Sequence, residues 1–218
     1  MIICNCLARL NIDVKGLIFD CDGVLFDSRL ANIKYYNAVK KMCNLPTLSP
    51  EEEDYIHIHS VQESFQKILP QEFWPKIPEI RKHISYDKFY KYLKMEPGLR
   101  ELLIFLKQKN IRIAINTNRT NTMFPILYYY DLHIYFSPVV TADTVVFSKP
   151  HPESVYLILD KWKLSAHNVA YIGDSILDAE CALQSKVFFW SYKNPDLDCD
   201  LLIWDFYSLR TYLKDMGN

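Results

Sequence analysis

The sequence predicts an α/β protein with a doubly wound parallel sheet and an inserted all-helical domain. Two observations support this fold class. Short apolar runs alternate along most of the chain with segments of helical periodicity, as expected for strands joined by helical crossovers. Between the first and second runs, however, lies a long stretch that contains only helical segments. The 218 residues are enough for one such domain with a small insertion.

Six apolar runs are expected to form the sheet. Continuous runs without polar alternation are typical of strands that are covered on both faces. In chain order they are 15–21, 111–116, 138–141, 168–172, 186–191 and a short run in the tail, which begins near residue 198 and ends in a helix. The helical segments between them are expected at about 97–110, 121–130, 152–163 and 175–185.

The inserted domain is predicted to span 28–94, which leaves 1–27 and 95–218 for the α/β core. Its helices are expected at 29–43, at 51–69 with a break, and at 78–94, with no strand up to residue 95. At helical spacing, its many aromatic residues indicate packing more than ligand stacking. Its cations are expected on a solvated face, although a second anionic group of a substrate is an alternative partner; they include Arg29, Lys34, Lys40 and Arg81.

Composition limits the function classes. The formal net charge of −1 argues against a nucleic-acid or anionic-membrane surface, and no apolar run is long enough to cross a bilayer. The six cysteines include no CxxC pair, which favours reduced thiols in the cytoplasm, and the start of the chain lacks the features of a signal peptide. We therefore expect a cytoplasmic monomer or homodimer that acts on a small polar molecule.

Two clusters of acids follow predicted strands. Asp20 and Asp22 end the first run, where side chains two apart share a face, and Gly23 allows the backbone to turn. Asp174 ends a later run, and Asp178 lies one helical turn beyond it. Each cluster has an ordinary explanation, as a strand-to-loop turn or as a helix N-terminus capped by acids.

Two further candidates are weak on their own. Thr117 and Asn118 follow the run at 111–116 and offer a hydroxyl and a backbone N–H to a phosphoryl oxygen, although both are common helix caps. Lys149 precedes a proline and a helix, and a single lysine is usually a solvated surface charge.

The joint pattern is stronger than its parts, because ligands bind at the carboxyl ends of strands in open α/β sheets. Carboxylates about 4 Å apart repel by roughly 4 kcal/mol at an effective dielectric near 20, so Asp20, Asp22 and Asp174 require a cation if they converge. Oxygen ligands without His or Cys favour Mg²⁺ over Zn²⁺. With Lys149 nearby, the site would suit a phosphate dianion.

These residues resemble the haloacid dehalogenase superfamily, in the subclass with a helical cap after the first strand. Its DxDGxxxD motif matches 20–27 and its GDSxxD motif matches 173–178, while Thr117 and the Lys149–Pro150 pair match the two intervening motifs. The resemblance covers about 15–191 and implies a Rossmann-like core with a cap domain. Phosphoglycolate phosphatases share this layout.

The resemblance implies a two-step phosphoryl transfer to water through an aspartyl phosphate. Asp20 would be the nucleophile, and Asp22 would protonate the leaving oxygen and then activate water. Magnesium would bind Asp20, the backbone carbonyl of Asp22, and Asp174, with Asp178 as a further or outer ligand. Thr117 and Lys149 would stabilise the transferring group, which Gly23 and Asn118 would also contact. A carboxylate at Asp22 argues against dehalogenase activity, because family dehalogenases lack it.

Two alternatives remain open. A β-phosphoglucomutase-like enzyme would share this architecture, but such mutases usually carry a histidine where this chain has Asn32. A non-enzymatic receiver or an inactive relative would be shorter or would lack one of the motif residues, and all of them are present.

Overall fold

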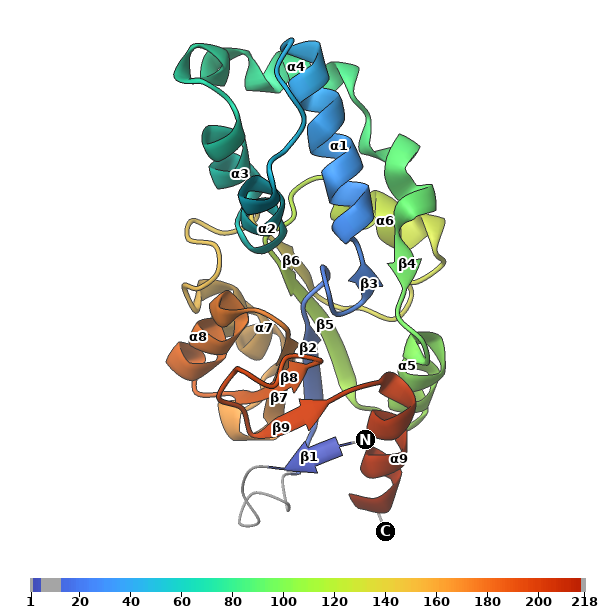
Figure 1. Cartoon of the computed structure of the whole chain (residues 1–218). Coiled ribbons are helices and arrows are strands. Elements are labelled where there is room, and N and C mark those ends of the chain that lie inside the picture. The colour runs from blue at the N-terminus through green and yellow to red at the C-terminus, as the bar shows by residue number, and fades with distance from the viewer. Residues whose placement is uncertain (1, 5–12, 217–218) are drawn as a thin grey trace.

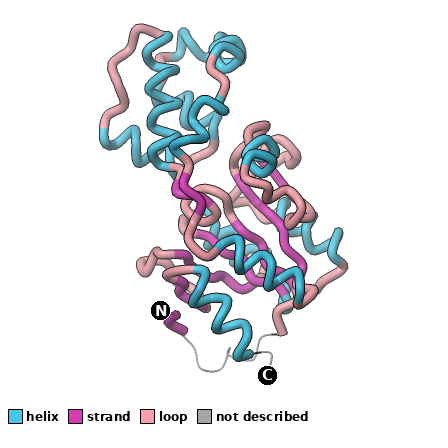
Figure 2. The backbone as a smooth tube through the Cα atoms, turned by 90° about the vertical axis from the view of Figure 1, so that its right-hand side faces the viewer, coloured by secondary structure: helices cyan, strands magenta, loops and turns pink. Residues whose placement is uncertain are grey.

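The computed structural model describes residues 2–4 and 13–216 (Figure 1). A sheet covered by helices forms the larger part of the molecule, and a group of helices stands beyond one edge of that sheet. A short two-stranded element connects the two parts (Figure 2). No helix in the described ranges is both long and apolar enough to cross a membrane.

The sheet has seven strands in the order β1-β9-β8-β7-β2-β5-β6. Six of them are parallel, which confirms the predicted fold class, and β1 pairs antiparallel with β9 at the edge. The strands are β1 (Ile2–Cys4), β2 (Gly16–Phe19), β5 (Arg112–Thr117), β6 (Val139–Thr141), β7 (Val169–Gly173), β8 (Phe188–Tyr192) and β9 (Leu201–Ile203). The sequence did not predict β1.

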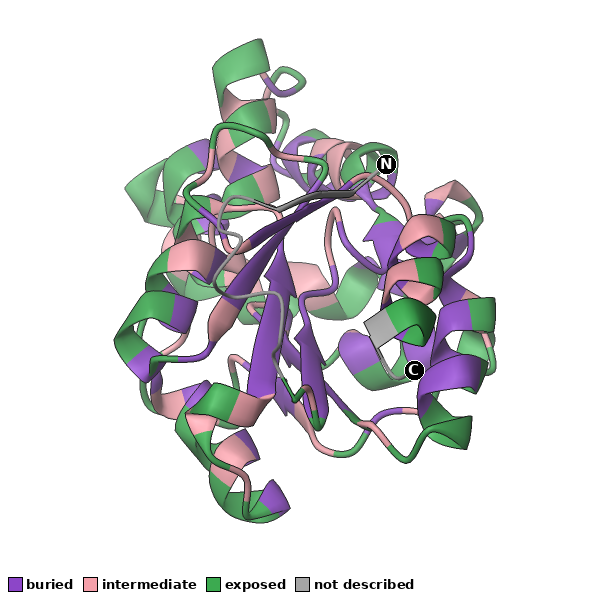
Figure 3. Ribbon diagram, turned by 90° about the horizontal axis from the view of Figure 1, so that it is seen from below, coloured by how far each residue is buried: buried purple, intermediate pink, exposed green. Residues whose placement is uncertain are grey.

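Helices cover both faces of the sheet, because alternate side chains of each strand point to opposite sides. Leu17 and Phe19 of β2 pack in the cluster that contains the apolar faces of α5 (Leu99–Gln108), α6 (Met123–Tyr129) and α9 (Phe206–Met216). Ile18 packs in the other cluster, with α7 (Glu153–Trp162) and α8 (Ile176–Ser185). The strands are accordingly buried at the centre of the core (Figure 3).

The helical part, called the cap below, lies between β3 (Phe26–Asp27) and β4 (Lys94–Met95), which pair antiparallel. Its elements are α1 (Arg29–Met42), α2 (Pro50–Ile58), α3 (Val61–Ile68), α4 (Ile77–His83) and the 3₁₀ helices η2 (Gln71–Lys76) and η3 (Tyr86–Tyr92). Capping boxes explain where α2 and α3 begin, since Ser49 and Ser60 each exchange hydrogen bonds with a glutamate three residues later.

Two details of the prediction for this part were wrong. The helix expected at 78–94 is divided, because the backbone is extended at Ser85 and a 3₁₀ helix follows. The aromatic-rich sequence of that second half has a low helix propensity, and the break lets Tyr86 and Tyr90 become buried. The stretch up to residue 95 also contains a strand, β4, whose two residues are too few to show a pattern.

Candidate active site

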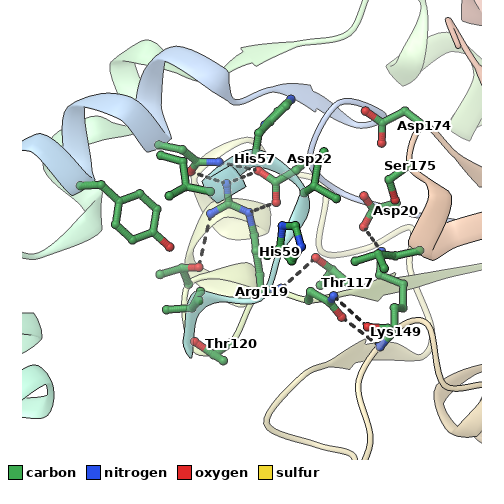
Figure 4. A pocket seen from close by; sticks show the side chains of 18 of the residues that line it. Asp20, Asp22, His57, His59, Thr117, Arg119, Thr120, Lys149, Asp174 and Ser175 are labelled. Atoms are coloured by element: carbon green, nitrogen blue, oxygen red, sulfur yellow. Dashed lines mark hydrogen bonds and ion pairs between the residues drawn. The ribbon is translucent and has the colours of Figure 1, made fainter. Parts of the chain in front are cut away.

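A cavity of about 420 Å³ opens between the carboxyl ends of the central strands and the cap (Figure 4). The structure brings six of the residues singled out from the sequence to its wall: Asp20, Asp22, Thr117, Asn118, Lys149 and Asp174. Asp178 is fully buried next to this wall, and Gly23 lies against Asp174. Residues far apart in the chain thus meet at the predicted edge of the sheet.

Three carboxylates and one ammonium group lie together at the floor of the cavity and directly beneath it. Carboxylate oxygens of Asp20, Asp174 and Asp178 all lie within 4.8 Å of one another. Lys149 Nζ lies 2.7 Å from Asp20 Oδ1 and 2.6 Å from Asp178 Oδ1, and its side chain is almost completely buried. Lys149 therefore orients the proposed nucleophile and ties it to the adjacent acid.

The charges on this floor do not balance. Burial, together with the neighbouring acids, raises the pKa of Asp20 to about 7 despite Lys149, and raises the pKa of Asp174 well above its usual value. Three carboxylates face a single ammonium group, so a divalent cation would offset the remaining negative charge. Such a cation would favour the ionised forms of the carboxylates. An all-oxygen donor set of this kind fits a hard cation such as Mg²⁺.

Asp178 is held by several donors. Tyr171 Oη donates to Asp178 Oδ1 over 3.1 Å, while the backbone N–H and the hydroxyl of Ser175 donate to Oδ2. With Lys149 also bound to Oδ1, both oxygens already have partners. These contacts favour a role in orienting Lys149 and the other acids over direct contact with a metal.

Two glycines allow the acids to approach closely. Gly23 has φ +77°, and a Cβ there would lie 2.0 Å from Asp174 Oδ2. A Cβ on Gly173 would lie 2.3 Å from the Cβ of Asp178. The Gly23 N–H donates to the carbonyl of Phe26, which closes the turn after Asp22. Gly23 thus makes room for Asp174, a function that the sequence alone did not indicate.

Thr117 and Asn118 end β5 beside Lys149. The Thr117 hydroxyl, buried at the cavity wall, accepts a hydrogen bond from the Arg119 backbone N–H. The Asn118 side chain accepts from the Lys149 N–H over 3.1 Å and donates to the Lys149 carbonyl over 3.3 Å. Asn118 therefore fixes the backbone that presents Lys149. Its predicted contact with substrate stays a prediction.

Asp22 faces a different cation from Asp20, although both line the same cavity. Arg119 Nε and Nη2 donate to its two carboxylate oxygens over 2.7 and 2.6 Å (Figure 4). Burial alone would raise the pKa of Asp22, but Arg119 and the hydroxyl of Ser28 lower it to about 2. Sequence reasoning missed Arg119, because its pairing with a residue 97 positions earlier leaves no local signal.

The cap contributes an apolar and basic wall. Its lining residues are Asn32, Tyr35, Tyr36, Ile56, His57, Ile58, His59, Val61, Arg81 and Tyr86. Of the cap cations considered above, Arg81 lines the cavity, where it donates to the side chains of Thr120 and Asn121 in the core. Lys40 is instead paired with Glu52, and Arg29 with Asp54.

Fold and site together are those of an α/β protein with an aspartate-lined cavity beneath a helical cap. The family model for haloacid dehalogenase-like hydrolases matches residues 17–191, and the chain belongs to this family. The resemblance inferred from the motifs is confirmed, as is the conclusion that the protein is a hydrolytic enzyme.

Proteins similar to this chain include several phosphatases. The chain is 29% identical over 190 residues to a phosphorylated carbohydrates phosphatase of Thermotoga maritima, covering 80% of this chain and 82% of the relative. It is 24% identical to a phosphoglycolate phosphatase of Haemophilus influenzae, covering 94% of this chain and all of the relative. A crystal structure of a haloacid dehalogenase-superfamily hydrolase from Geobacter sulfurreducens has a TM-score of 0.77 at 32% identity, covering 86% of this chain and 93% of that one.

Proposed function

We propose that the protein is a magnesium-dependent phosphatase that hydrolyses a small phosphorylated metabolite through an aspartyl phosphate, in the manner of a phosphoglycolate phosphatase. The observation that carries this proposal is the position of Asp20. It ends a central strand at the floor of a cavity, it is bound by a buried lysine, and two further carboxylates lie beside it. Of the two neighbouring carboxylates, Asp178 is buried and Asp174 is half-buried. That combination suits a nucleophile that must approach a phosphate dianion.

In the first step a carboxylate oxygen of Asp20 attacks phosphorus. The bond from phosphorus to the alcohol oxygen breaks, its electron pair stays with that oxygen, and the Asp22 carboxyl supplies the proton. In the second step Asp22 takes a proton from water, which attacks the phosphorus and releases inorganic phosphate and free Asp20. The Lys149 ammonium and the Thr117 hydroxyl would stabilise charge on the transferring group in both steps.

Asp20, the backbone carbonyl of Asp22, and Asp174 are the groups proposed to hold Mg²⁺, with Asp178 beneath them. When bound, the ion would offset the repulsion between the nucleophile and the phosphate oxygens. Asp178 supports this arrangement through Lys149, which it shares with Asp20.

The substrate is proposed to carry a second anionic group on its alcohol portion. Arg81, His57 and His59 are basic or ionisable residues on the cap wall, and no carboxylate of the cap lines the cavity among the described residues. A cavity of about 420 Å³ has space for more than a phosphate group. A phosphorylated hydroxy acid such as phosphoglycolate fits this chemistry.

The mutase alternative receives less support from the cap. Asn32 stands where a mutase of this architecture usually has a histidine, and its amide is bound to Asp22 over 3.2 Å.

A cytoplasmic location and a monomer or homodimer remain predictions from the sequence, as do the absence of nucleic-acid and membrane partners and the domain boundaries.

The test is a panel of phosphate esters assayed with Mg²⁺ for release of inorganic phosphate. We expect release from small phosphorylated acids or sugars. Interconversion of glucose phosphates without net release would instead identify a mutase, and inactivity on the whole panel would contradict both assignments.

A further inference from the structure

Both carboxylate oxygens of Asp22 accept hydrogen bonds, and Lys149, which binds Asp20, is not among the donors. Arg119 binds both oxygens, Asn32 Nδ2 lies 3.2 Å from Oδ1, and the Ser28 hydroxyl also donates to Oδ1. Lys149 is bound instead to Asp20, as Figure 4 shows, and to Asp178. In this arrangement the proposed acid is turned toward Arg119 and is fully engaged there.

The same guanidinium also contacts the cap. Arg119 Nη2 donates to the hydroxyl of Tyr86 over 3.0 Å and to Asn32 Oδ1 over 3.3 Å. The Tyr86 hydroxyl donates to Asn32 Oδ1 over 2.6 Å, and the Tyr86 ring lies 4.9 Å from Arg119 Cζ. Arg119 belongs to the core, after β5, whereas Asn32 and Tyr86 belong to α1 and η3 of the cap. One buried side chain therefore joins the acid to two cap elements.

The reaction requires these contacts to change. To protonate the leaving alcohol, a carboxyl oxygen of Asp22 must lie against that oxygen, so Arg119 must release one of the two oxygens while it still orients the carboxyl group through the other. The chain passes between core and cap only at β3 and β4, two residues each, so the cap has a narrow connection about which it can shift. A shift of the cap would displace Asn32 and Tyr86 and thereby loosen Arg119.

We propose that Arg119 is a positioning residue that couples the position of the cap to the orientation of Asp22, with Tyr86 and Asn32 as its contacts in the cap. The inference rests on the proposed function, because it assigns Asp22 the role of proton donor. It predicts that substitution of Arg119 slows the first step for esters whose leaving alcohol needs a proton, and changes the rate little for esters whose leaving group needs none.

The experiment compares p-nitrophenyl phosphate, whose leaving group departs without a proton donor, with an alkyl phosphate. Release of the alcohol in a single turnover reports the first step alone. We expect Arg119→Met to slow this step for the alkyl ester by about tenfold more than for p-nitrophenyl phosphate, in the pattern of Asp22→Asn. Arg119→Lys should recover part of the difference, because it restores the charge without the fork.

Tyr86→Phe removes only the hydroxyl that contacts Arg119. The control is Tyr90→Phe, because Tyr90 is about as buried as Tyr86 in the same 3₁₀ helix and does not line the cavity. Tyr86→Phe should slow the alkyl ester selectively by a smaller factor than Arg119→Met, and Tyr90→Phe should change neither ester. If Arg119→Met fails to fold, Arg119→Lys and Tyr86→Phe decide the question.

An equal loss on both esters, or a faster alkyl ester in any Arg119 variant, would overturn the inference. If the wild type cleaves neither ester, the proposed function itself fails, which is a distinct outcome.

Discussion

The core and the cap present residues to the same cavity in different ways. In the core, β2 pairs in register with β5 and β7, so the backbone brings the ends of these strands to one edge. In the cap, contact with the core around the cavity runs through side chains, such as Arg81 to Thr120 and Tyr86 to Arg119. The backbone of the sheet therefore fixes where the core residues stand, whereas the cap meets the core at the cavity through side-chain contacts.

The largest effect is expected for the nucleophile of the core. Asp20→Asn replaces an attacking carboxylate oxygen by an amide, and turnover should fall by about a thousandfold or more. Thermal unfolding should show an intact fold, because Lys149 keeps its bond to Asp178. Asp160→Asn, an exposed change on α7, is the control. Rates like those of the wild type would remove Asp20 from its role and would weaken the distinction between core and cap.

The metal provides the next test of the core. A chelator should stop turnover, and Mg²⁺ at a hundred times its Kd should stabilise the wild type by about 2.7 kcal/mol in thermal unfolding. Asp174→Asn removes one of three crowded carboxylates, so the variant should be more stable than the metal-free wild type and should no longer respond to Mg²⁺. Full activity in excess chelator would count against magnesium.

The ion pair between Asp22 and Arg119, where the core meets the cap, should make the stability of the protein depend on pH. The pKa of Asp22 is about 2 in the folded protein against 3.8 for an ordinary Asp, which corresponds to about 2 kcal/mol. Because the folded pKa is the lower one, this stability is present above about pH 4 and is lost as the pH falls through about 2. Urea unfolding at decreasing pH should show that the free energy of unfolding of the wild type falls by about 2 kcal/mol more than that of Asp22→Asn. The exposed variant Asp87→Asn should follow the wild type. Parallel curves for wild type and Asp22→Asn would contradict the ion pair with Arg119.

The smallest effect is expected in the cap. Arg81→Ala should raise KM about tenfold for a phosphate ester with a second anionic group, with little change in kcat, because the lost contact is distant from the reacting atoms. Lys82→Ala, at the exposed neighbouring position, is the control. A drop in kcat with unchanged KM would move Arg81 from substrate selection into the chemistry of the core.

The sequence predicted the core better than the cap, for physical reasons. The six parallel strands are buried on both faces, so each appears as a continuous apolar run, and the acids stand where those runs end. The side-chain bridges across the two domains have no such local pattern. Arg119 binds an aspartate 97 residues earlier, and the two-residue strands β3 and β4 are too short to detect. The split of the last cap helix depends on burial of Tyr86 and Tyr90, which is a tertiary effect.

The absence of a side chain at Gly23 has a consequence for how this enzyme tolerates change. The space a methyl group would take there is already filled by a carboxylate oxygen of Asp174, so even alanine must push apart the loops after β2 and β7. The sheet beneath would be untouched, because both strands end before this point. Damage at Gly23 should therefore leave a well-folded protein whose acids no longer converge on a common centre.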